Sequence, residues 1–107
     1  MIAADPAYLE IILGIIKKHI PNCKVLAIGS RVRWTHSETS DLDLVIVGDK
    51  KLEFGLLGEI REDLMESDVP FRIDVLDYRA VSESFRGIID RENVILYNTL
   101  SEPSEGV

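Results

Sequence analysis

The stretch Asp41–Val47 places the strongest constraint on how this chain of 107 residues can fold. It alternates between aspartate and leucine, continues with β-branched apolar residues and is followed by Gly48, which together predict a β-strand. Because successive side chains point to opposite faces of a strand, Asp41 and Asp43 share one face, while the residues between and after them join the core. Two neighbouring carboxylates repel each other unless a cation lies between them. The strand therefore predicts an acidic face suited to a metal ion.

A second apolar strand with an aspartate in its middle is predicted at Phe71–Leu76. If this strand lies beside the first, Asp74 completes a cluster of three carboxylates with Asp41 and Asp43. Three carboxylates can hold two metal ions, which bind the attacking and leaving oxygens of an in-line phosphoryl displacement. Asp77 follows three residues later and would point to the other face if the strand continued, but it is predicted to be a turn residue.

A short motif, Gly29-Ser30, follows a third predicted strand at Cys23–Ile28. Glycine permits a tight backbone turn, and the serine hydroxyl with the free N–H groups beyond it can face an anion. Arg31 and Arg33 add positive charge that a phosphate would attract. The plainer interpretation is that Ser30 only caps a helical turn and that the arginines are solvated.

The remaining pattern predicts one domain over residues 1–100 and a flexible tail over residues 101–107. Apolar residues recur at helical spacing after Asp5-Pro6 and again in two later segments, and a short strand closes the chain. The order implies an α+β fold in which helices pack against a small mixed sheet. The first predicted helix starts at Asp5-Pro6 and ends before Pro21. The second and third are predicted at Leu52–Ser67 and Val81–Ile89, and the last strand at Val94–Tyr97.

The first predicted helix carries apolar residues on more than one face, because Ile11 and Ile15 widen its stripe. One interpretation is that the extra apolar surface contacts another chain. The other is that the sheet covers one face of this helix and the third helix covers the other.

Composition narrows the functional classes. The formal net charge is −7 with a pI near 4.7, which argues against direct binding of nucleic acid and favours a basic protein partner or a small anion carried with metal. The apolar runs are too short to cross a membrane. The single cysteine, Cys23, cannot form an internal disulfide and is predicted to be a small core residue. These features predict a cytoplasmic protein.

Gly29-Ser30, then Asp41-x-Asp43, then Asp74 resembles the nucleotidyltransferase core of the DNA polymerase beta superfamily. The segment GSRVRWTHSETSDLDLVIVG followed by RIDVLDY is similar to the stand-alone minimal nucleotidyltransferases, or MNT proteins. The resemblance implies an antitoxin that pairs with a helical HEPN-domain RNase and forms a hetero-oligomer with it. It also implies that the antitoxin uses ATP and Mg²⁺ to transfer AMP to a hydroxyl group of that RNase. It implies that Asp41, Asp43 and Asp74 hold two Mg²⁺ ions and that Gly29 and Ser30 bind the nucleotide phosphates.

Two alternatives stay open at this point. Trp34 stands where the family commonly has glycine, which favours a weakly catalytic binding module that neutralises its partner by occlusion. The third hypothesis is a nucleotidyltransferase for a small molecule such as an antibiotic, although such members usually carry an extra domain. Modification of a helical partner protein would separate the enzyme from the binding module.

Overall fold

The computed structural model describes residues 6–28, 42–70 and 72–100. Within these ranges the elements follow the predicted order, including the closing strand. They are α1 (Pro6–His19), β1 (Lys24–Ile28), β2 (Leu42–Val47), α2 (Leu56–Met65), β3 (Ile73–Asp77), α3 (Glu83–Arg91) and β4 (Val94–Asn98). None of the described helices is long and apolar enough to cross a membrane.

The four strands form one mixed sheet in the order β3-β2-β1-β4. β1 is antiparallel to both of its neighbours, whereas β2 and β3 run parallel. A parallel pair cannot be joined by a tight turn, and α2 provides the crossover between these two strands. The prediction of a small mixed sheet packed with helices is confirmed.

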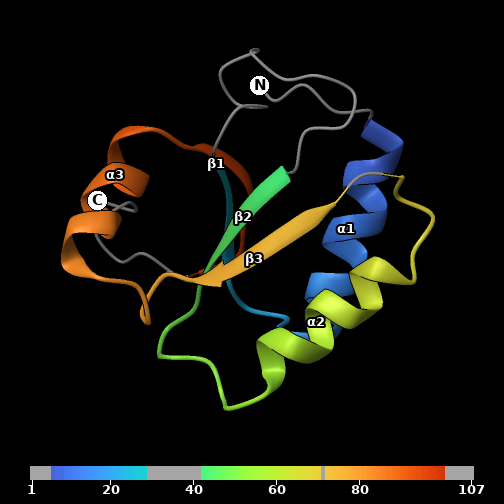
Figure 1. Cartoon of the computed structure of the whole chain (residues 1–107), viewed down its shortest axis with the longest axis horizontal. Helices are drawn as coiled ribbons and strands as arrows, with labels where there is room; N and C mark the ends of the chain where they lie inside the picture. Colours follow the sequence, from blue (N-terminus) through green and yellow to red (C-terminus); the bar gives the residue numbers. More distant parts are fainter. Residues whose placement is uncertain (1–5, 29–41, 71, 101–107) are drawn as a thin grey trace.

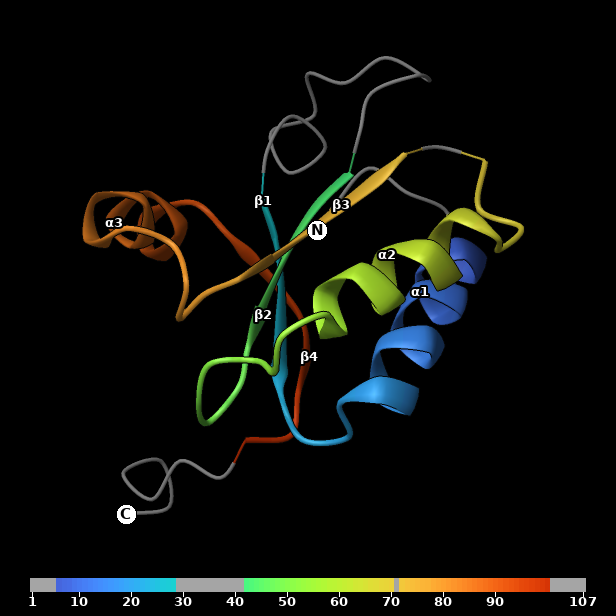
Figure 2. The same cartoon turned by 60° about the horizontal axis from the view of Figure 1, so that its bottom comes forward.

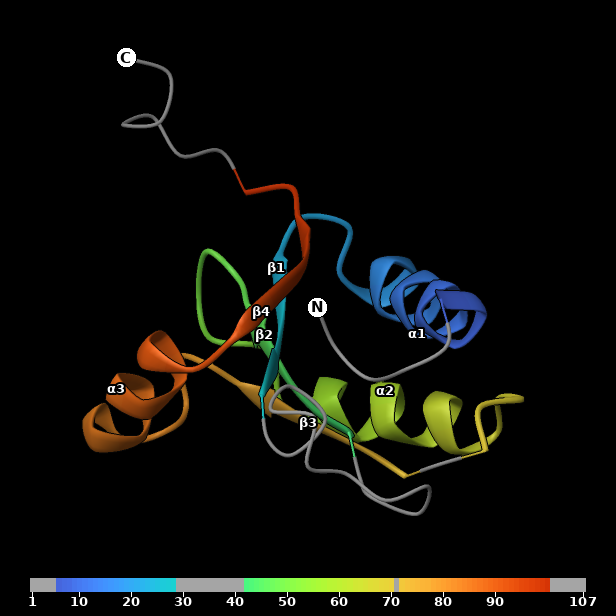
Figure 3. The same cartoon turned by 90° about the horizontal axis from the view of Figure 1, so that it is seen from above.

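Helices lie on both faces of the sheet. α1 and α2 lie together on one face and α3 lies on the other (Figure 1, Figure 3). The alternation of β2 explains this division, since Leu42, Leu44 and Ile46 are fully buried in the cluster beneath α1 and α2. Val45 and Val47 point the other way and pack with Ile89 of α3.

The second helix begins later than predicted, at Leu56 instead of Leu52. The Leu52 N–H donates to the Asp77 carboxylate over 2.9 Å, which ties this part of the chain to the end of β3. Gly55 then adopts a left-handed conformation with φ of 85°, so the helix can start only after it. The conformation of Gly55 therefore sets the start of α2, and the contact with Asp77, 25 positions away, holds the connection before it.

The extra apolar residues of α1 contact the core of the molecule. Ile11 and Ile15 are partly buried and pack against the same cluster as Ile12 and Ile16, which are fully buried. The helix that packs beside α1 is α2, not the third helix, because α3 lies on the opposite face of the sheet (Figure 2). His19 at the end of α1 reinforces this contact, since its Nε2 lies 2.6 Å from Oδ2 of Asp63 on α2.

Candidate active site

Two of the predicted metal ligands lie next to each other on parallel strands. Asp43 of β2 is the register partner of Asp74 of β3. Asp43 is half-buried, and the side chain of Asp74 is 54% exposed, so the pair is accessible from solvent. Both residues point to the face that carries α3, but the apolar cluster beneath α3 does not reach them. The arrangement leaves two carboxylates side by side at the beginning of their strands.

The described part of the chain contains no group of three His, Cys, Asp or Glu residues placed to hold a metal ion. Asp41, the third predicted ligand, lies outside the described residues, so a cluster of three stays a prediction. The two carboxylates that are described still suit Mg²⁺, which prefers oxygen ligands. It commonly binds through one or two carboxylates together with substrate phosphates and water.

The predicted phosphate-binding residues Gly29, Ser30, Arg31 and Arg33 also lie outside the described residues. The described strand ends on either side of them belong to the same end of the sheet as the carboxylates. Ile28, the last residue of β1, is the register partner of Asp43. Leu42, the first residue of β2, donates its N–H to the carbonyl of Arg72 just before β3.

Asp74 contacts a basic residue that the sequence did not single out. Arg61 of α2 places its Nε 3.6 Å from Asp74 Oδ1 and donates from Nη2 to the Val75 carbonyl over 2.6 Å. The Val75 N–H in turn donates to Asp74 Oδ1 over 3.0 Å. The only sequence signal for Arg61 is its place beside the inward-facing Ile60, which puts it on the flank of the helix.

Asp77 serves a structural role on the other face of the sheet, and the prediction that it is a turn residue is wrong. It is the last residue of β3 and is only 4% exposed. Besides the Leu52 N–H, its carboxylate accepts from the Arg79 N–H over 3.0 Å, and its carbonyl accepts from Ala80 in the turn that follows. A carboxylate committed to two backbone donors on the other face of the sheet is not available to the Asp43–Asp74 pair.

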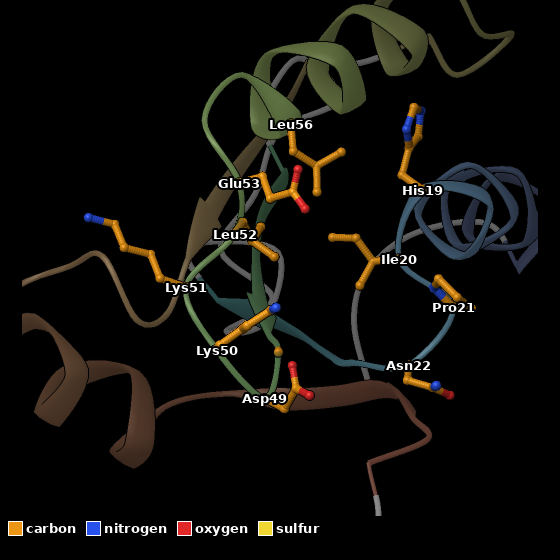
Figure 4. Close-up of a pocket in the computed structure, with 11 residues that line it drawn as sticks. His19, Ile20, Pro21, Asn22, Asp49, Lys50, Lys51, Leu52, Glu53 and Leu56 are labelled. Carbon is orange, nitrogen blue, oxygen red and sulfur yellow. The ribbon is translucent and has the colours of Figure 1, made fainter.

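An open pocket of about 270 Å³ lies at the opposite end of the sheet (Figure 4). It is formed by the turn between α1 and β1 and by the connection from β2 to α2. Its lining mixes apolar side chains with charges of both signs and contains neither Asp43 nor Asp74. The lining residues include Ile20, Pro21, Asn22, Asp49, Lys50, Leu52 and Glu53.

Cys23 beside this pocket is fully buried, as predicted for a small core residue. Burial raises the pKa of its thiol to about 11. The thiolate is the nucleophilic form of cysteine, so Cys23 stays protonated and unreactive near neutral pH. Asp43 and Asp74 are therefore better candidates for catalytic groups than Cys23.

Comparison with known proteins identifies the family. Residues 10–102 match the model of the family described as polymerase beta, nucleotidyltransferase. The chain is also 39% identical over 88 residues to Probable protein adenylyltransferase MntA of Haemophilus influenzae, a match that covers 82% of this chain and 77% of that protein. The chain is a minimal nucleotidyltransferase. The family predicted from the Gly-Ser and aspartate motifs is thereby confirmed.

Solved structures share the fold of this nucleotidyltransferase. A toxin–antitoxin crystal structure with AMP-PNP matches with a TM-score of 0.74 and 20% identity, and the match covers 85% of this chain and 73% of that one. A structure of a tri-AMPylated Shewanella oneidensis HEPN toxin in complex with an MNT antitoxin matches with a TM-score of 0.69 and 17% identity. That match covers 87% of this chain and 71% of that one.

Proposed function

We propose that this minimal nucleotidyltransferase is an ATP- and Mg²⁺-dependent protein adenylyltransferase that modifies a HEPN-type toxin and thereby acts as its antitoxin. The observation that carries the proposal is the pairing of Asp43 with Asp74 across parallel strands. The relative from Haemophilus influenzae is named as a protein adenylyltransferase, and the structural relatives include an AMPylated HEPN toxin with its MNT antitoxin. Both support the same reaction class.

The residues outside the described ranges complete the proposed site. Asp41 would join Asp43 and Asp74 in binding two Mg²⁺ ions. Gly29 and Ser30 would bind the nucleotide phosphates through backbone N–H groups and the serine hydroxyl. Arg31 and Arg33 lie close to this motif in the sequence and would add positive charge near the triphosphate.

The proposed reaction moves one nucleotidyl group. The acceptor hydroxyl oxygen of the partner attacks the α-phosphorus of ATP, and a new P–O bond forms. The bond from that phosphorus to the oxygen bridging to the β-phosphate breaks, and pyrophosphate leaves with the bonding electrons. Asp74 accepts the proton of the attacking hydroxyl, and Asp43 would hold the Mg²⁺ that binds the triphosphate. When bound, Mg²⁺ would neutralise phosphate charge and make the hydroxyl proton easier to lose.

The partner supplies the acceptor in this proposal. The described sheet and helices leave the two carboxylates accessible to an acceptor group on another protein. A formal charge of −7 favours a partner with a basic surface and disfavours direct contact with nucleic acid. The working assembly would accordingly be a hetero-oligomer with the helical toxin.

The test uses ATP labelled in either its α- or its γ-phosphate and follows the label to a purified HEPN-domain protein encoded beside this chain. With Mg²⁺, label in the α-phosphate should be transferred to the partner and label in the γ-phosphate should not, and intact mass should rise by whole AMP units. Asp43→Asn should lower transfer by at least about 100-fold, because loss of groups that merely support a metal ligand already costs 10–100-fold. Asp49→Asn is the matched control, since Asp49 is an exposed carboxylate at the other end of the sheet.

The outcome separates the alternatives. A partner that is inhibited by stoichiometric binding, with no α-label and no effect of Asp43→Asn, would identify a binding module instead of an enzyme. Transfer of label to a small acceptor but not to the HEPN protein would identify a small-molecule nucleotidyltransferase.

A further inference from the structure

Arg61 is a described cation that touches the proposed metal site, and it reaches Asp74 from a different element. In the sheet formed by the described residues, β3 is an edge strand and pairs with β2 alone. The Val75 N–H and carbonyl both point out from this edge, as the N–H and carbonyl of one strand residue do. The Asp74 carboxylate accepts from the N–H, and Arg61 Nη2 donates to the carbonyl. Arg61 and Asp74 thus together satisfy the free edge of β3 at Val75.

A third polar group in this arrangement, Nε of Arg61, makes no hydrogen bond with the described residues. This nitrogen is buried, although the side chain as a whole is 43% exposed. The nearest acidic atom is Asp74 Oδ1 at 3.6 Å, which is within ion-pair range but longer than a hydrogen bond. A buried donor without an acceptor is costly unless nearby negative charge compensates it. Its position therefore indicates an electrostatic role toward the carboxylate in addition to the bond that docks α2 on β3.

We infer that Arg61 is a positioning residue that supplies the resident counter-charge of the acidic pair when no metal is bound. Its guanidinium offsets the repulsion between Asp43 and Asp74, which are register partners. With the Val75 N–H, it keeps Asp74 Oδ1 turned toward the edge of the sheet, so that Oδ2 is left to face the ligand. This inference rests on the proposed metal site, because the resident cation and a bound Mg²⁺ compete for the same negative charge.

The experiment compares Arg61→Gln with Arg61→Lys, in protein that lacks nucleotide. Both variants disturb the bond to the Val75 carbonyl, but only the first removes the charge. Mn²⁺ binding is titrated by electron paramagnetic resonance, and the melting temperature is measured in EDTA. Arg61→Gln should bind Mn²⁺ about two- to fivefold more tightly than wild type, which is the range that a half-exposed ion pair supplies. It should also melt at a lower temperature than Arg61→Lys in EDTA.

The possible results are distinct. If wild type binds Mn²⁺ but the two variants match each other in affinity and in melting temperature, Arg61 only docks the helix and the inference is overturned. If wild type binds no Mn²⁺, the proposed metal site itself fails. Should Arg61→Gln not fold, Asp74→Asn replaces it. In that case added salt should lower the metal-free stability of wild type more than that of Asp74→Asn, and an equal salt effect would overturn the inference.

Discussion

The two faces of the sheet differ in how completely helices cover them. On the face beneath α1 and α2, the β2 side chains that point toward these helices are fully buried in one large cluster. They are Leu42, Leu44 and Ile46. On the face beneath α3, the cluster is smaller and stops before Asp43. Its buried members are Leu26, Val45, Val47 and Ile89.

This difference shows how a short chain can hold both a core and a polar site. Two helices close one face, and the single helix on the other face covers only the second half of β2 (Figure 3). Among the described residues, the first half of that face carries the two carboxylates. Asp43 can therefore be half-buried beside Asp74 without an aspartate entering the large cluster, and a polar ligand can approach without disturbing the packing that stabilises the fold.

Matched isoleucine substitutions on the two faces should give the largest change in stability. Ile60 of α2 and Ile89 of α3 are both fully buried, and each lies in a helix that packs on the sheet. Isoleucine-to-alanine changes in cores cost about 2–5 kcal/mol. We expect Ile60→Ala near the upper end of that range and Ile89→Ala near the lower end, because the smaller cluster can relax more readily around a cavity. Urea unfolding measures both, and equal costs would show that the two faces are equally well packed.

The strands and the family could be predicted from the sequence because their signals are local. Asp41–Val47 alternates at its start and is β-branched, and the Asp43–Asp74 pairing needed only the added assumption that the two strands are neighbours. The sequence also placed Cys23 in the core correctly. The strand and core signals depend on residues that lie close together along the chain, whereas the family motif combines several such local signals.

Contacts between distant residues account for what the sequence reading missed. The connection that leads into α2 is held by Asp77, whose carboxylate accepts from the Leu52 N–H 25 positions earlier in the sequence. Arg61 has no motif around it, and its role follows only from α2 lying along the edge of β3. The covering of α1 by α2 was missed for the same reason, since the amphipathic stripe of a helix does not specify which element packs on it.

Two aspartates on β3 should separate stability from activity. Asp77→Asn should cost about 1.5–3 kcal/mol of unfolding free energy, because the charge is lost and an NH2 group then faces one of the two buried backbone N–H groups. Asp74→Asn should cost less than about 1 kcal/mol, as expected for an exposed ion pair, yet it should abolish transfer of α-label. Urea unfolding and the transfer assay on the same preparations give both values. A stable but inactive Asp77→Asn would move the site to the other face.

The smallest expected effect concerns Asp43 in the absence of metal. Like charges at paired strand positions destabilise a sheet by about 0.2–1 kcal/mol. Since Asp43 lies opposite Asp74, Asp43→Asn should leave the melting temperature in EDTA unchanged or slightly raised, with Arg61 limiting the gain. Mg²⁺ with ATP should raise the melting temperature of wild type, because a ligand that binds only the folded state stabilises it, and this rise should be missing from Asp43→Asn. Thermal unfolding with and without Mg²⁺ and ATP tests both statements. Marked destabilisation in EDTA would mean that Asp43 is needed as a hydrogen-bond acceptor, in which case the open half of this face would be a structural feature of the sheet and not a site prepared for a cation.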